Sequence, residues 1–357
     1  MRRLTVLVVV LGILGAIAYA WVMASWTQAG PAARAGGETV VMIPSGTRAH
    51  DTAGMLEAAG VVNNALLFEA GLRLRGLAAA IKAGEYAFPS GASMADVAGV
   101  LVAGRSIQHR LTVAEGLTSD MVWKLVANDP VLEGDPGTVP EEGTLLPETY
   151  LYTRGQTRAG LLAQMRRAQE KVLLAAWNAR AEGLPISTMR EAVILASIVE
   201  KETALPSERR RIAAVFINRL RVGMRLQTDP TIIYGITKGY PLGRGIRQSE
   251  LEGATPYNTY VIAGLPPGPI CNPGKDSIAA VLNPESVDDL FFVADGSGGH
   301  AFASSITEHN RNVARWRALE RGAPIPIEAN DRLEKSPVPV PEAADQKLPA
   351  AARKRVK

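Results

Sequence analysis

Apolar and polar residues follow one another along this chain with periods that change from segment to segment. Leu4 to Met23 form an uncharged, apolar stretch of about 20 residues, close to the length that a helix needs to cross a bilayer. A small, flexible linker follows at residues 27–38, and beyond it short apolar runs alternate with segments of helical period. The pattern therefore predicts an α+β protein preceded by one transmembrane helix.

One pattern occurs three times: a short apolar strand, a turn that contains glycine, and a helix. The turn glycines are Gly46, Gly91 and Gly116, and a Ser or Thr follows each within two residues, where it can cap the helix. A further helical stretch at 64–84 lies between the first two copies, so residues 39–108 are expected to form a strand–helix–helix–strand module. This arrangement resembles the LysM-like domain of exported wall-binding proteins, although a plain packing module or spacer would have the same pattern. The three copies span residues 40–56, 85–101 and 110–125.

The second half of the chain predicts a larger mixed α+β domain at residues 109–324. Residues 127–143 are rich in Pro, Gly and acidic side chains and predict a long loop, either a boundary or a flap over a site. A helix with an apolar stripe is expected at 157–181. Residues 325–357 contain mainly Pro, Ala and charged residues, which predicts a disordered tail.

Composition and charge exclude several classes of function. The net charge is only +4, from 39 Lys and Arg against 35 Asp and Glu. The sequence contains no dense basic stripe interleaved with aromatic residues, so it does not indicate nucleic-acid binding. A single cysteine, Cys271, excludes an intramolecular disulfide, and the four histidines lack a metal-ligand spacing. We therefore expect no metal or other cofactor.

The charges around the apolar stretch predict its orientation. Arg2 and Arg3 precede it and the next basic residue is Arg34, so residues 1–26 are expected to be a membrane anchor with its amino terminus in the cytoplasm. The small residues of Ala18-Tyr19-Ala20 would also suit signal-peptide cleavage. An uncleaved anchor is favoured because apolar residues continue to Met23. Both alternatives export the rest of the chain.

Candidate chemistry lies in the segment ASIVEKET, where two glutamates follow an apolar run. Thr188 and Glu191 have capping-box spacing and predict a helix start. At 100° per residue, Glu202 lies within about 20° of the mean direction of the apolar residues, whereas Glu200 points almost the opposite way. A carboxyl group on an apolar face holds its proton more tightly, as a general acid must. The alternative is a glutamate at a frayed helix end, exposed or paired with an arginine among 209–211.

Two other segments contain residues suited to binding a sugar. After a predicted short strand, Gln227 and Thr228 form a polar turn, and Asp229 precedes Pro230 as a helix N-cap would. Tyr257, Asn258 and Tyr260 combine aromatic rings with an amide, which suits sugar rings and N-acetyl groups. His300, between two predicted hairpin strands, is interpreted as structural.

Six segments together resemble the YceG-like family of endolytic murein transglycosylases, over about residues 40–316. The resemblance implies a periplasmic enzyme, anchored in the inner membrane, that cuts inside nascent peptidoglycan strands, between N-acetylmuramic acid (MurNAc) and N-acetylglucosamine (GlcNAc). It implies that the cut leaves 1,6-anhydro ends. It implies Glu202, the last residue of the EKE triplet, as the essential glutamate, which the helical face indicates independently. In chain order, the segments are ASIVEKET, VFINRLRVGMRLQTDPT, YNTY, GLPPGPI, NPG and FVADGSGGHAF.

A lytic transglycosylase requires only one carboxyl group, which agrees with the lack of an obvious second catalytic carboxylate. Candidate substrate-binding residues are Gln227, Thr228, Asp229, Tyr257 and Asn258. The resemblance also implies partners among the penicillin-binding synthases of the elongation machinery. A hydrolytic muramidase with Asp229 as its second carboxylate, and a non-catalytic wall-binding scaffold, are the alternatives.

Overall fold

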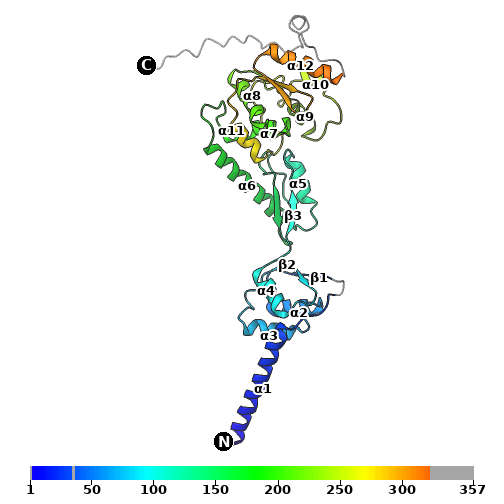
Figure 1. Cartoon of the computed structure of the whole chain (residues 1–357), viewed down its shortest axis with the longest axis vertical. Helices are drawn as coiled ribbons and strands as arrows, with labels where there is room; N and C mark the ends of the chain where they lie inside the picture. Colours follow the sequence, from blue (N-terminus) through cyan, green and yellow to red (C-terminus); the bar gives the residue numbers. More distant parts are fainter. Residues whose placement is uncertain (1, 34–36, 322–357) are drawn as a thin grey trace, which may run out of the picture. The chain divides into compact units, whose positions relative to one another are not determined.

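The computed structural model describes residues 2–33 and 37–321, so the predicted disordered tail at 325–357 lies outside the described residues. Within that part the protein is a mixed α+β molecule of two compact units (Figure 1). Of the described residues, unit 1 comprises those up to 111 together with 126–136 and 149–161, and unit 2 comprises the others, so the chain passes between the units several times.

Unit 1 contains the predicted strand–helix–helix–strand module. Its two strands pair antiparallel, with Thr39 opposite Phe88 and Met42 opposite Glu85. The fully buried side chains of its core include Phe68 and Tyr86. The elements are α1 (Arg2–Thr27), β1 (Glu38–Ile43), α2 (Ala49–Ala58), α3 (Ala65–Leu74), β2 (Gly84–Pro89), α4 (Met94–Ala103), β4 (Thr149–Tyr152) and most of β3 (His109–Thr112), which pairs with β4.

The three predicted glycine turns are present, with two of the three expected caps. Gly46, Gly91 and Gly116 all have φ between 76° and 81°, a conformation that glycine adopts without steric cost. Ser93 caps α4 in a capping box, and Thr118 accepts a hydrogen bond from the first turn of the next helix. The expected cap after Gly46 is wrong, because the Thr47 hydroxyl donates to the carbonyl of Pro44.

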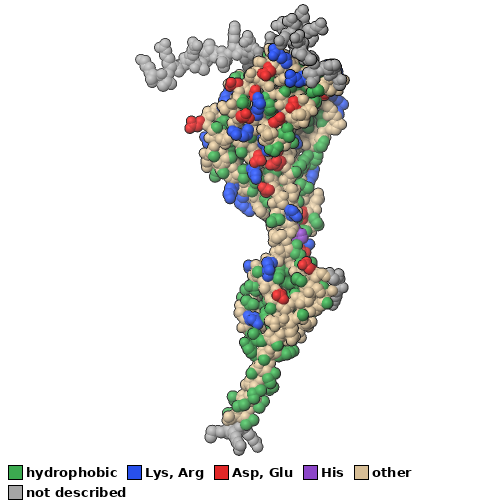
Figure 2. All heavy atoms as spheres, viewed as in Figure 1, with side chains coloured by type: hydrophobic (Ala, Val, Ile, Leu, Met, Phe, Trp, Pro, Cys, Tyr) green, Lys and Arg blue, Asp and Glu red, His purple; other side chains and the backbone are tan. Residues whose placement is uncertain are grey.

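The first helix, α1, has the length and composition of a membrane span. Leu4–Thr27 is a run of 24 residues that includes an 18-residue stretch of mean hydropathy 2.5, and its apolar side chains are exposed (Figure 2). Near its end, however, Trp26 is only 3% exposed, because it packs on α3. The apolar helix is therefore joined to unit 1 by a packed contact.

Unit 2 is built around the predicted glutamate helix, α7 (Met189–Glu202). The residues from Ala192 to Val199 are all buried, since α8 (Arg209–Arg221) packs on one part of α7 and α11 (Lys275–Leu282) on another. The helix predicted at 157–181 is α6 (Arg158–Asn178). The remaining elements are most of α5 (Ser119–Ala127), α9 (Asp229–Thr237), α10 (Gln248–Glu252), β5 (Phe291–Ala294), β6 (His300–Ala303) and α12 (Ile306–Glu320).

Two sequence predictions around the candidate site have opposite outcomes. The hairpin is confirmed, since β5 pairs antiparallel with β6 and Phe292 lies opposite Phe302. The short strand expected before Gln227 is absent, because residues 224–228 are irregular. The buried Arg219 side chain and the backbone of Thr259 bond to this segment in place of a neighbouring strand.

Candidate active site

The end of α7 directs its two glutamates to different partners. The Thr188–Glu191 capping box is present and fixes the start of the helix. Glu200 accepts hydrogen bonds from the Gly274 backbone N–H at 2.9 Å and from the Ser277 hydroxyl at 2.7 Å. Glu200 therefore satisfies donors at the amino terminus of α11, where a carboxylate is favourable. Glu202 turns instead toward the segment before α9.

The carboxyl group of Glu202 lies inside the protein, although the residue keeps some exposed surface. It accepts a hydrogen bond from the Thr228 hydroxyl. Burial raises the pKa of Glu202, and the charge of Asp229 raises it further, whereas the Thr228 hydrogen bond offsets part of this effect. The frayed and arginine-paired alternatives do not occur. A raised pKa is the property that a carboxyl group needs to act as a general acid.

Thr228 is itself held by two buried threonines. Its backbone N–H donates to the Thr259 hydroxyl at 3.0 Å, and its carbonyl accepts from the Thr231 hydroxyl at 2.7 Å. The two threonine hydroxyls also bond each other at 2.8 Å. Because Thr228 is only 2% exposed, this network fixes the direction of its hydroxyl toward Glu202.

Gln227 has a strained backbone and a free side chain. Its φ of 50° places it in the left-handed region, which is uncommon for residues other than glycine. The Arg219 guanidinium holds the preceding carbonyl, that of Leu226, at 2.6 Å. Among the described residues, the side-chain amide of Gln227 has no hydrogen-bond partner, so it is free to bind a ligand.

Arg219 also contributes charge to the site. It is 7% exposed, and burial lowers its pKa to about 10. The charges of His300 and Arg219 both favour the ionised form of Glu202. The site therefore combines groups that favour each of the two protonation states of one carboxyl group.

Asp229 lies beside Glu202, but not in the predicted capping role. It is the first residue of α9, the N-cap is Thr228, and no side-chain cap bond forms there. The exposed Asp229 carboxylate instead accepts the Tyr260 hydroxyl at 2.7 Å, and burial raises the pKa of that phenol. The local sequence favoured a cap, but a tyrosine 31 residues away binds the carboxylate.

The other two candidates do not gather around Glu202. Asn258 is fully buried, and its amide nitrogen donates to three carbonyls of residues 250–253 while its oxygen accepts from the Tyr260 N–H. Its polar atoms are thus used within the fold. Tyr257 packs on Tyr234, with ring centroids 4.9 Å apart, and on the cation of Lys238. None of its described contacts is with Glu202.

Several residues that organise the site were missed in the sequence. The Glu208 carboxylate binds His300 twice, at 2.9 Å through the backbone N–H and at 2.7 Å through ring Nδ1. This pair ties the β5–β6 hairpin to the start of α8. The spacing between Glu208 and His300, 92 residues, gives no local sequence signal. Arg219 and Thr259 were likewise missed as site residues, whereas Tyr260, which the sequence indicated as a sugar contact, donates to Asp229.

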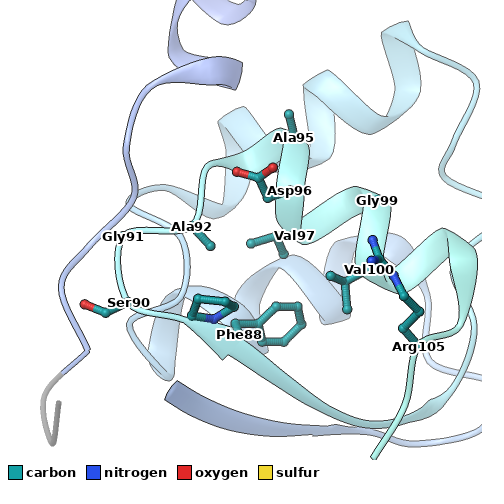
Figure 3. A pocket seen from close by; sticks show the side chains of 11 residues that line it. Phe88, Ser90, Gly91, Ala92, Ala95, Asp96, Val97, Gly99, Val100 and Arg105 are labelled. Carbon is teal, nitrogen blue, oxygen red and sulfur yellow. The ribbon is translucent and has the colours of Figure 1, made fainter. Parts of the chain in front are cut away.

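A separate hollow lies in unit 1, beside α4 (Figure 3). Its volume is about 440 Å³ and its lining includes Ser90, Asp96 and Arg105. The Asp96 carboxylate is already bound to Ser93, and the hollow is lined wholly by unit 1 residues, so it is distinct from the Glu202 site. Within residues 2–33 and 37–321, no group of three or more His, Cys, Asp or Glu could hold a metal ion.

Comparison with known proteins gives relatives for most of the chain. It is 27% identical over 307 residues to an endolytic murein transglycosylase of Bacillus subtilis, which covers 77% of this chain and 84% of that protein. A Streptococcus pneumoniae protein of the same name is 29% identical over 326 residues, and the match spans 57% of its length. A crystal structure of a YceG-like protein from Listeria monocytogenes, 28% identical, covers 77% of this chain and 98% of that one, with a TM-score of 0.48.

A family profile extends the same result across both units. The profile of the YceG-like family matches residues 41–315, which include nearly all of the module of unit 1 and every residue of the Glu202 site. The chain therefore belongs to the YceG-like family.

Proposed function

We propose that this protein is an endolytic lytic transglycosylase of peptidoglycan, with Glu202 as its single catalytic acid and base. The observation that carries the proposal is the buried Glu202 carboxyl group, with its raised pKa and its hydrogen bond from Thr228. The names of the relatives, both endolytic murein transglycosylases, support the choice of substrate and reaction.

In the proposed reaction, protonated Glu202 donates its proton to the oxygen that links MurNAc to GlcNAc. The bond from the anomeric carbon to that oxygen breaks, and GlcNAc leaves with a free 4-hydroxyl group. Ionised Glu202 then takes the proton of the MurNAc 6-hydroxyl, whose oxygen bonds to the anomeric carbon. This closes the 1,6-anhydro ring, restores the Glu202 proton and consumes no water.

The surroundings of Glu202 suit both halves of this cycle. Burial and Asp229 favour the neutral acid that the first step needs, whereas Thr228, His300 and Arg219 favour the carboxylate that the second step needs. A base whose two forms are both accessible near neutral pH is the most effective proton carrier.

For substrate binding, we assign Gln227 the strongest role. Gln227 precedes Thr228 in the chain, and its amide, which has no partner among the described residues, can exchange hydrogen bonds with an acetamido group. Thr228 positions Glu202, and the exposed Asp229 carboxylate can accept from a sugar hydroxyl. Asn258 is assigned to holding the loop at 250–253, because its polar atoms are already bonded. Tyr257 is left as a more distant sugar contact.

The remaining features of the proposal concern location. We propose that α1 is retained as a single-pass anchor in the inner membrane and that both units lie in the periplasm, where nascent strands emerge. The module of unit 1 is proposed to be LysM-like and to bind the wall. The penicillin-binding synthases that extend the strands are the proposed partners.

The test is cleavage of purified glycan strands by the full-length protein and by Glu202→Gln. Loss of a general acid is expected to slow cleavage by about 10²–10⁴-fold without unfolding the protein. Glu200→Gln is the matched control, since it makes the same change two residues away, and it should retain cleavage. Unchanged turnover in Glu202→Gln would refute the catalytic assignment and favour a non-catalytic scaffold.

The products separate the two enzymatic alternatives. Mass spectrometry should find 1,6-anhydro-MurNAc ends, which lack the mass of one water. Reducing ends would instead indicate hydrolysis, for which Asp229, beside Glu202, is the available second carboxylate.

A further inference from the structure

The end of α1 is fixed against α3 by several contacts. The Trp26 ring stacks on Phe68 with centroids 5.8 Å apart. A Cβ atom at Gly71 would lie 2.2 Å from the Trp26 ring, so only glycine fits there. The Arg75 guanidinium lies 4.9 Å from the Trp26 ring centroid and donates to the Met23 sulfur at 3.5 Å. The apolar helix and α3 therefore form one packed junction.

At this junction α3 runs across the end of α1, on the side of unit 1 from which α1 leaves (Figure 1). One face of α3 is buried in unit 1 through Phe68 and Leu72, both fully buried. The opposite face presents Leu66, Ala70 and Leu74, which recur every fourth residue and so form one stripe along the helix. The two leucines are 69% and 55% exposed, respectively.

A stripe of exposed leucines is costly in water and favourable in the interfacial layer of a bilayer. Hydrophobic side chains cover α1, which gives this stripe an apolar neighbour (Figure 2). Arg75 sits between the two helices, where a long cationic side chain can reach lipid headgroups. The chemistry of the stripe thus matches a lipid surface at the point where α1 would enter the membrane.

We propose that α3 docks on the membrane surface through Leu66, Ala70 and Leu74, and so holds unit 1 against the bilayer. This proposal rests on α1 being a retained anchor, and it is independent of the reaction catalysed in unit 2. Since α1 and α3 are locked together at Trp26, insertion of α1 brings the stripe to the interface. The anchor then fixes the orientation of unit 1 as well as its attachment.

The test uses spin labels on the full-length protein in lipid nanodiscs. Leu66→Cys, Leu74→Cys and the control Val40→Cys are labelled separately, and the unsubstituted protein checks that the buried Cys271 stays unlabelled. Val40 is 55% exposed on β1, which lies on the side of unit 1 away from α1. Power-saturation EPR then compares access by oxygen, which enters lipid, with access by a water-soluble nickel chelate.

We expect the ratio of oxygen to nickel access to be several-fold higher at positions 66 and 74 than at position 40. In a second series of variants, Ala70→Cys carries the label and Leu66→Asp with Leu74→Asp removes the apolar stripe. That change should lower the ratio at position 70 to that of position 40, while the protein stays in the nanodisc. Equal ratios at positions 66, 74 and 40 in the first series would overturn docking.

Two controls separate this outcome from failure of the other proposals. Intact mass and co-elution with the nanodisc report whether α1 is present and inserted, and a chain lacking α1 would overturn both the anchor and the docking. Cleavage of soluble glycan strands by the same samples reports the Glu202 site. Retained cleavage with equal label ratios would contradict docking alone.

Discussion

Glu202 and Thr228 show how two residues can create an acid that neither would provide alone. The helix brings the carboxyl group into the interior, where burial raises its pKa, and the Thr228 hydroxyl donates to it from another segment. Thr259 and Thr231 hold that hydroxyl donor in place. Burial thus favours the protonated form of Glu202, whereas the Thr228 hydrogen bond favours the carboxylate.

Removal of the Thr228 hydroxyl should shift that balance. In Thr228→Val the pKa of Glu202 is expected to rise further, because a hydrogen bond that favours the carboxylate is lost. Activity that needs protonated Glu202 is lost as the pH rises through this pKa, so the alkaline limb of kcat/KM should move to higher pH. A hydrogen bond to a charged group contributes about 1.5–3 kcal/mol, which corresponds to about one to two pH units. Thr228→Ser keeps the hydroxyl and should keep the profile; an unmoved limb in the valine variant would contradict the assignment.

The same pKa makes a prediction about stability. The pKa of Glu202 in the folded state lies above the usual 4.5, so the folded state binds the proton more tightly than the unfolded state does. The free energy of unfolding therefore falls as the pH rises from 4.5 to the folded pKa. Glu202→Gln carries no charge and should unfold at a higher temperature than wild type above the folded pKa. The gain should be about 1.4 kcal/mol for each pH unit by which the pKa is raised. Thermal unfolding from about pH 4 to pH 8 tests this, and a gain independent of pH would argue against a buried acid.

At the scale of elements, α7 is buried on more than one face and uses its two glutamates differently. One is directed toward α9 and the other caps α11, with Lys201 between them. Helix α11 has Gly274 as its N-cap, which offers no side-chain acceptor, and Glu200 instead accepts from the Gly274 N–H and the Ser277 hydroxyl there. The EKE triplet thus combines one candidate catalytic group with one structural group.

Truncation of the structural glutamate should therefore affect stability more than chemistry. Glu200→Ala leaves the Gly274 N–H and the Ser277 hydroxyl without their acceptor, and loss of a cap costs about 0.5–2 kcal/mol. The free energy of unfolding, measured in urea, should fall by that amount, while the pH profile of cleavage stays as in wild type. In Glu200→Gln the amide oxygen can still accept, so the loss should be smaller. Equal stability of wild type and Glu200→Ala would rule out the cap.

At the scale of the whole molecule, the two units have separate hydrophobic cores. One core contains Phe68 and the strands β1 and β2, and the other contains Phe216 and the helices α7, α8 and α11. No residue belongs to both clusters among those the structure describes. Separate cores predict separate unfolding, because cooperativity depends on shared packing.

Calorimetry should accordingly resolve two transitions. Phe68→Ala should lower the free energy of unfolding of unit 1, and Phe216→Ala that of unit 2, each by about 3–5 kcal/mol, because both side chains are fully buried. The corresponding calorimetric transition should move to a lower temperature. Each substitution should leave the other transition in place. A single transition that moves with either substitution would show that the units unfold together.

The sequence by itself determined the features that depend on neighbouring residues. Hydrophobic period predicted the apolar helix, the paired strands of unit 1 and the glutamate helix, and short-range spacing predicted the glycine turns and the Thr188–Glu191 cap. The direction of Glu202 followed from helix geometry alone. Each of these is decided within a few residues, where backbone sterics and local hydrogen bonds act.

The tertiary structure decided which residues meet. Thr228 binds Glu202 across 26 residues of sequence, and Gly274 binds Glu200 across 74. Asn258 was an equally suitable sugar-binding candidate in the sequence, but its amide forms hydrogen bonds within its own loop. The left-handed backbone of Gln227 likewise depends on a segment that Arg219 and Thr259 hold from elsewhere. Local sequence cannot specify such contacts, because a side chain's partners and its burial, and hence its pKa, are set only when distant segments pack together.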